Sequence, residues 1–185
     1  MKNSSYIARV GMLLALAVSL QFLESLIPIP LPLGVKPGIS SVVIMYILMF
    51  MDLRTALVVT VLKSGFVFAT RGASAFCMSV SGGLLSTAAM WLCIALFRRK
   101  SGDTGILAVS AAGGVFHNAG QLAAASAIAG SVYTAAYLPV LVIAGIISGA
   151  FTGILMRLLL SRINKKSEGR DIIYDKKAKR TETES

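Results

Sequence analysis

Charged residues are scarce in this chain. Asp, Glu, Lys and Arg together make up 14% of its 185 residues, whereas apolar residues make up 56%. A soluble domain usually carries about 25% charged residues. The composition therefore excludes an ordinary water-soluble globule and predicts an integral membrane protein.

Residues that bind metals or form disulfides are also few. The chain has one histidine and two cysteines, Cys77 and Cys93. On one helix these cysteines would lie about 24 Å apart, at 1.5 Å of rise per residue, so they cannot bridge each other. We therefore expect no disulfide framework, no metal site and no cofactor.

The motifs of common phosphate-handling enzymes are missing. Binding of a diphosphate through Mg²⁺ usually relies on clustered carboxylates, and the sequence has no DDxxD motif. It also has no GxxxxGK[ST] loop, so the chain is not its own ATP motor. The apolar run that contains His117 has no aspartate within it for Ser-His-Asp catalysis. We therefore expect no catalysis by this chain alone.

The sequence does contain six long apolar runs with few charges. They cover residues 6–27, 38–51, 53–69, 73–97, 106–129 and 135–160. A spanning helix needs about 17–25 residues, so the second run is short. The first is too long for a signal peptide and lacks a cleavage site after it. We predict an all-α integral membrane bundle of six transmembrane helices over residues 1–160.

Basic residues are distributed unevenly between the ends of these runs. If the N-terminus is inside, the outer segments hold only Lys36 and Arg71, and most other cations are inside. The positive-inside rule therefore predicts that both termini are cytoplasmic. This asymmetry accounts for most of the net charge of +10 without nucleic acid. Residues 161–185 have mixed charge and predict a disordered basic cytoplasmic tail, either solvated or in contact with anionic membrane lipid.

The first run has two faces of different character. At 100° per residue, four small side chains fall within about 80° of one another. Such a stripe lets another helix approach closely, either a partner protein's or one from this chain. Gln21 and Glu24 lie on roughly the opposite face, where they would border a polar cavity. The small-residue stripe consists of Ala8, Gly11, Ala15 and Ser19.

Polar side chains interrupt later runs at a similar depth. Lys63 lies past the middle of the third run, where a charge is costly unless it is paired, snorkels or lines a wet cavity. In the fifth run, the polar side chains of His117, Asn118 and Gln121 project within an arc of about 100°. We predict a ligand site in the outer half of the bundle, under the proline-rich loop of residues 28–37. The alternative is a hydrogen-bond network that only holds the bundle together.

The candidate ligand-binding residues come from four parts of the chain. Cations outnumber the single carboxylate among them, which favours an anionic or zwitterionic small molecule. These candidates are Gln21, Glu24, Lys36, Lys63, His117, Asn118 and Gln121.

Four segments resemble one bacterial membrane family. They are FLESLIP at 22–28, GVKPG at 34–38, SGGLLS at 81–86 and HNAGQL at 117–122. The family is labelled heptaprenyl diphosphate synthase component I and also Gx transporter, and the resemblance covers residues 6–160. Ser40-Ser41 stands where we would expect an Ala-Asn pair.

The two labels imply different functions. The first implies a non-catalytic membrane component of an enzyme that makes the menaquinone side chain, with a soluble prenyltransferase as partner. The second implies similarity to the substrate-binding S subunits of energy-coupling factor transporters. Those six-helix proteins dock on a transmembrane coupling subunit through a small-residue stripe in helix one, and ATPases drive them.

The stripe in the first run favours the second label. Our main interpretation is therefore a substrate-binding transport subunit in the bacterial cytoplasmic membrane. The synthase component is the alternative, and a structural scaffold without a ligand is a third interpretation.

Overall fold

The computed structural model describes residues 2–26, 38–97, 103–130 and 136–183, and the side chains of residues 4–26, 38–96, 105–130 and 136–163. No strand occurs in these ranges, so the prediction of an all-α fold is confirmed. The elements are α1 (Lys2–Leu26), α2 (Ser41–Phe50), α3 (Leu53–Arg71), α4 (Ala73–Phe97), α5 (Asp103–Ala129) and α6 (Leu138–Thr183).

Four helices are long and apolar enough to cross a membrane. They are the segments Ser4–Leu26, Leu53–Arg71, Ala73–Leu96 and Leu138–Ile163. Their length and apolar composition identify the chain as a membrane protein. Helix α2 has 10 residues, a length of about 15 Å, and is therefore too short for a bilayer core of about 30 Å. Helix α5 is long enough, but the polar side chains at its centre lower its mean hydropathy. The described residues form six helices, as predicted, but within these ranges only four have both the length and the composition of a span.

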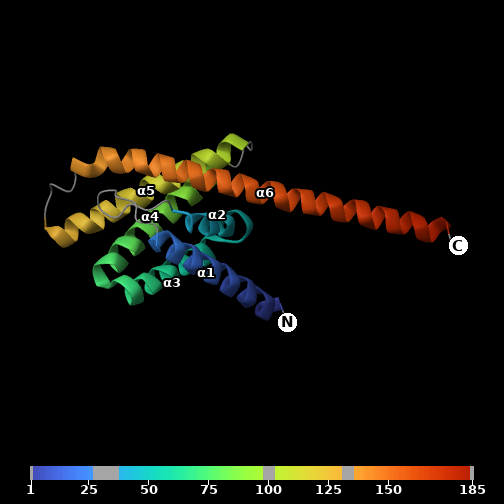
Figure 1. Cartoon of the computed structure of the whole chain (residues 1–185), viewed down its shortest axis with the longest axis horizontal. Coiled ribbons are helices and arrows are strands. Elements are labelled where there is room, and N and C mark those ends of the chain that lie inside the picture. The colour runs from blue at the N-terminus through green and yellow to red at the C-terminus, as the bar shows by residue number, and fades with distance from the viewer. Residues whose placement is uncertain (1, 27–37, 98–102, 131–135, 184–185) are drawn as a thin grey trace.

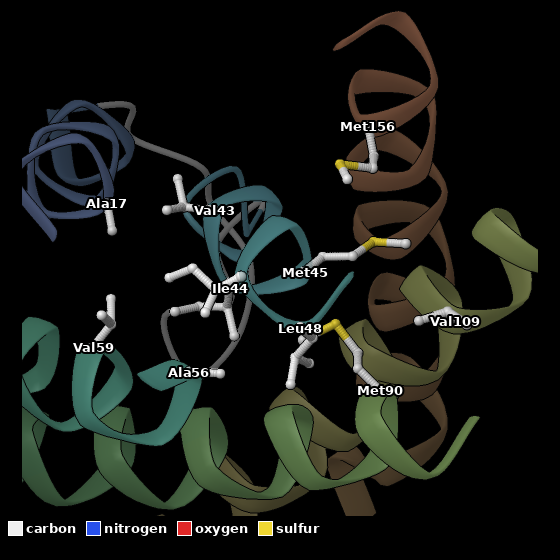
Figure 2. Close-up of a cluster of buried hydrophobic side chains, with 11 residues drawn as sticks. Ala17, Val43, Ile44, Met45, Leu48, Ala56, Val59, Met90, Val109 and Met156 are labelled. Atoms are coloured by element: carbon white, nitrogen blue, oxygen red, sulfur yellow. The ribbon is translucent and has the colours of Figure 1, made fainter. Parts of the chain in front are cut away.

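The short helix α2 lies at the centre of the bundle. Figure 2 shows its side chains surrounded by residues from the other five helices. Five of its ten residues are buried, whereas Met49 and Phe50 at its C-terminal end are exposed. The second apolar run therefore forms a short helix that is covered over most of its length. The surrounding residues are Ala17 of α1, Ala56 and Val59 of α3, Met90 of α4, Val109 of α5 and Met156 of α6.

Glycines let α4, α5 and α6 cross at close range. A Cβ atom added to Gly145 would lie 2.7 Å from the Val115 Cα, and one added to Gly120 would lie 2.6 Å from the Ser81 carbonyl oxygen. Carbon atoms do not approach so closely without displacing the backbone. The glycines of α6 are therefore a packing feature. Helix α4 continues through Ser81-Gly82-Gly83, so these glycines permit close approach and do not end the helix.

Helix α6 continues well beyond the sixth apolar run (Figure 1). Its backbone is helical to Thr183, which differs from the disordered tail that we expected. The segment is rich in Lys, Arg and Glu, which are good helix formers. The boundary at 160/161 between a membrane domain and a tail remains a prediction. The N-terminal end of α1 and the C-terminal end of α6 extend to the same side of the bundle (Figure 1).

Candidate ligand-binding site

A cavity of about 170 Å³ lies between α1, α3, α4, α5 and the turn before α2. A cavity of about 150 Å³ in another protein is large enough to hold benzene, so this one has room for a small molecule. Eleven of its seventeen lining residues carry charged or hydrogen-bonding side chains. Its polar lining consists of Gln21, Glu24, Ser25, Ser40, Ser41, Lys63, Thr70, Arg71, Ser79, His117 and Gln121.

Two buried groups of opposite charge meet at Ser40. The Ser40 backbone N–H donates to Glu24 Oε1 at 2.6 Å, and Lys63 Nζ donates to Ser40 Oγ at 3.1 Å. Glu24 is 3% exposed and Lys63 is 4% exposed, and their charges attract each other. Because an isolated buried charge is very costly, this arrangement holds the two charges together. It links α1, the turn before α2, and α3.

His117 and Gln121 form the part of the cavity wall that α5 contributes. Their Nε2 atoms lie 3.2 Å apart. His117 Nδ1, which lies beside the Gly82 backbone, forms no hydrogen bond of good geometry within the described ranges, and neither does Gln21 Oε1. Together with Gln21, His117 and Gln121 add hydrogen-bonding side chains to the cavity lining.

The structure brings five of the seven predicted ligand residues to one cavity. Their convergence from α1, α3 and α5 agrees with the expected depths, although their role in binding remains a prediction. Lys36 and the proline-rich loop of residues 28–37 lie outside the described residues. The five residues are Gln21, Glu24, Lys63, His117 and Gln121.

Asn118, the remaining predicted ligand residue, does not line this cavity. Its side chain is 2% exposed, and its Nδ2 donates to the Leu141 carbonyl of α6 at 2.9 Å. Asn118 is about 100° from His117 around the helix, whereas Gln121 is only about 40° from it. His117 and Gln121 therefore face the cavity, whereas Asn118 faces α6 and joins α5 to α6.

The small-residue stripe of α1 faces away from the bundle. Ala8, Gly11, Ala15 and Ser19 are all exposed, and a Cβ atom added to Gly11 would have nothing within 4 Å. The alternative of close packing within this chain is therefore not found among the described residues. Docking of a partner on the stripe remains a prediction.

Ser40 is one of six polar lining residues that were not among the predicted ligand residues, and it makes the central contact of the site. A serine just before an apolar helical run is typical of an N-cap, and this position does precede α2. Its side chain makes no capping hydrogen bond, however, and its hydroxyl accepts the hydrogen bond from Lys63 instead. No local pattern in the sequence distinguishes these two roles.

Recognition of a ligand suits this arrangement better than catalysis does. Glu24 is the only carboxylate among the lining residues that the structure describes. Nowhere in the described ranges do three His, Cys, Asp or Glu side chains gather as metal ligands. Clustered carboxylates are what a Mg²⁺-bound diphosphate usually needs. The cavity can hold a small molecule by charge and hydrogen bonds.

Comparison with known proteins places the chain in a family. Residues 13–159 match the family described as heptaprenyl diphosphate synthase component I. The matched region begins within α1, ends within α6 and includes every residue of the cavity lining. No curated protein and no solved structure matches the chain. The chain belongs to the heptaprenyl diphosphate synthase component I family.

Proposed function

We propose that this protein is a non-catalytic membrane subunit that binds a small polar ligand in the cavity and works with a partner protein. The observation that carries the proposal is the contact of Glu24 and Lys63 through Ser40 at the cavity wall. Ionisable side chains inside a membrane segment are costly and commonly mark a functional site. Packing alone does not require them.

The lining indicates the class of ligand. Lys63 and Arg71 would attract a carboxylate or phosphate group, while Glu24 would attract an amine. Gln21, His117 and Gln121 add neutral hydrogen-bonding side chains to the lining. An anionic or zwitterionic small molecule therefore fits, whereas a long prenyl chain is much larger than a cavity of about 170 Å³.

Family membership favours a prenyltransferase as the partner. In this role the chain is the membrane component of a two-part heptaprenyl diphosphate synthase that supplies the menaquinone side chain. The partner would carry the clustered carboxylates and the Mg²⁺ chemistry, because this chain lacks a DDxxD motif. This candidate has the support of the match over residues 13–159.

The exposed stripe on α1 favours a second candidate. A face of small residues that no helix of this chain covers permits close approach of another membrane helix. In this role the chain is the substrate-binding subunit of an energy-coupling factor transporter, docked on a transmembrane coupling subunit with its ATPases. Enclosure of a polar cavity within the bundle also suits a substrate-binding subunit.

Purification of the tagged full-length chain from its native membrane distinguishes these candidates. A co-purified soluble, aspartate-rich prenyltransferase supports the synthase component. A co-purified coupling subunit with ATPases supports the transport subunit. Recovery of the chain with neither partner and no small molecule would contradict both and favour a scaffold.

We also propose six passes through the bacterial cytoplasmic membrane with both termini inside, in which the short helix α2 makes the second pass within the bundle and does not span the bilayer core by itself. The loop charges support this orientation, as does the common side of the two termini in Figure 1. Cysteines introduced at Arg71 and Tyr133 should react with an impermeant thiol reagent from outside. Cysteines at Arg99 and Lys165 should react only after the membrane is opened. Outside labelling at Arg99 would reverse the orientation.

A further inference from the structure

Three charged side chains line the ligand cavity in the part of the chain that the structure describes. Two are the cations Lys63 and Arg71, and the third is the carboxylate of Glu24. With His117 counted as neutral, the lining carries one positive charge in excess. Uncompensated charge is costly inside a membrane bundle. A ligand with a single negative charge would balance the cavity, whereas a zwitterion would leave the excess unchanged.

The two cations of the cavity differ in their surroundings. Lys63 is buried, donates to Ser40 Oγ at 3.1 Å and is attracted by the charge of Glu24. Arg71 lies eight residues further along α3, about 12 Å along the helix axis. Its side chain is exposed and has no hydrogen bond or ion pair within the described ranges. The cavity therefore has two cation positions, and its one carboxylate occupies the buried position.

Glu24 occupies the place that an anionic ligand would need. The Ser40 backbone N–H has one hydrogen, and it donates this hydrogen to Glu24 Oε1 at 2.6 Å. The same donor cannot serve a second carboxylate, and two carboxylates that share one site repel each other. A ligand carboxylate that approaches Lys63 and Ser40 therefore competes with Glu24.

The donors of this anion position are held more firmly than Glu24 is. Ser40 precedes α2, and Lys63 belongs to α3, and both of these helices contribute buried side chains to the apolar core. Glu24 lies near the end of α1, where its neighbours Phe22, Leu23 and Leu26 are exposed. The carboxylate can therefore be replaced while the donors stay in place.

We propose that the ligand is a small monocarboxylate that exchanges with Glu24. The ligand carboxylate accepts hydrogen bonds from the Ser40 N–H and from Lys63 Nζ. The Glu24 carboxylate moves to Arg71, whose guanidinium fork matches a carboxylate in charge and geometry. Two cations then face two carboxylates, and no charge is left uncompensated. This assignment rests on the proposed function, because it takes the cavity to be a ligand site, and it selects a monoanion over a zwitterion.

Equilibrium binding of lactate and alanine to the purified full-length protein tests the class of ligand. The two probes share a carboxylate and nearly the same shape, but alanine carries an ammonium where lactate has a hydroxyl. The wild type should bind lactate about tenfold more tightly than alanine, the scale of one charged hydrogen bond. Equal or tighter binding of alanine would overturn the assignment. Binding of neither probe would also overturn it, even if the gently purified protein carries another small molecule, which would keep the proposed function.

The variant Glu24→Gln tests the competition. It should raise the affinity for lactate about tenfold, because the competing carboxylate is gone. Thermal unfolding with and without lactate should confirm that the variant folds and that lactate stabilises it, since the ligand then compensates Lys63. A lower affinity for lactate in this variant would show that Glu24 holds the ligand, and would overturn the exchange.

Arg71→Gln, made in the wild type and in Glu24→Gln, tests where the displaced carboxylate goes. In the wild type it should lower lactate affinity about tenfold, because Glu24 loses its second cation. In the Glu24→Gln background it should have no effect, a non-additivity that a double-mutant cycle measures. Equal loss in both backgrounds would show that Arg71 binds the ligand directly, and would overturn the exchange. Arg54→Gln is the matched control, because Arg54 is an exposed cation of α3 that does not line the cavity. It should leave lactate affinity unchanged, and a loss equal to that of Arg71→Gln would reduce the effect to general surface charge and overturn the exchange.

Discussion

The charged pair at Ser40 makes a prediction that separates binding from stability. Lys63→Met would leave Glu24 buried opposite an apolar side chain. Breaking a buried pair in this way costs about 3–5 kcal/mol, so the thermal midpoint in detergent should fall. Affinity for the native ligand should fall about ten- to a hundredfold, because a charged hydrogen bond is lost.

The double variant Glu24→Gln with Lys63→Met is the control for that experiment. Removal of both charges should restore much of the lost stability, since neither group then remains uncompensated. It should not restore ligand affinity, as measured by equilibrium binding. Full recovery of affinity in the double variant would show that the pair is structural only.

Asn118 makes the opposite prediction. Asn118→Ala leaves the Leu141 carbonyl without its side-chain donor, which should cost about 1–3 kcal/mol of stability. Ligand affinity should stay unchanged, because Asn118 does not line the cavity. Thermal unfolding and ligand binding measured on the same preparation check both parts. Lost affinity at unchanged stability would return Asn118 to the ligand site.

Asp52 provides a pH-dependent test at the start of α3. The hydrogen bonds from the Thr55 side chain, the Thr55 backbone and the Tyr6 hydroxyl lower the pKa of the Asp52 carboxyl. Because its pKa is lower in the folded state, its stabilising contribution is present above the unfolded pKa of about 3.9. That contribution is lost as the pH falls through the folded value.

Asp52→Ala should therefore lower the stability by about 0.5–2 kcal/mol at neutral pH, the usual effect of losing an N-cap. The difference from the wild type should shrink as the pH falls through the acid range. Asp52→Asn is the matched control, since asparagine caps helices about as well as aspartate does. A difference from the wild type that is constant with pH would contradict this explanation.

At the scale of helices, the glycines of α6 and α1 should behave differently. Gly145→Leu places a large side chain where even a Cβ atom would meet the α5 backbone. Overpacking of this kind should cost at least about 1–3 kcal/mol. Gly11→Leu meets nothing within 4 Å, so the chain should fold normally but lose any partner that docks on the stripe. Loss of folding in Gly11→Leu, as judged by size-exclusion profile and thermal midpoint, would contradict the exposed position of the stripe.

Much of the helix pattern could be predicted from the sequence, because long apolar runs with few charges have few alternatives to a helix in a membrane. The expected run at 73–97 coincides with α4, and that at 53–69 falls two residues short of the end of α3. The central position of α2 could not be predicted, because a short apolar run fits a core helix and a shortened span equally well.

The ligand site could be predicted only in part, for a related reason. Angular spacing on a helix gives the direction of one side chain relative to another, but it does not say which neighbour stands in each direction. Lys63 and His117 therefore came together as expected, whereas Asn118 did not. Ser40 was missed because its hydroxyl bonds to a residue that is distant in sequence.

For the molecule as a whole, the structure separates a tightly packed part from a loosely packed one. Helices α4, α5 and α6 pack closely at their glycines, while α1 is mostly exposed. The ligand cavity lies beside the C-terminal end of α1. Changes in α1 should therefore affect ligand binding and partner docking before they affect the fold.

The most direct test of the central claim is native mass spectrometry of the full-length protein purified gently from its native membrane. We expect a bound small anion or zwitterion in the wild type and in Asn118→Ala. We expect loss of that molecule in the double variant Glu24→Gln with Lys63→Met. A wild-type protein that carries no small molecule, or a double variant that retains it fully, would contradict a ligand site in the cavity.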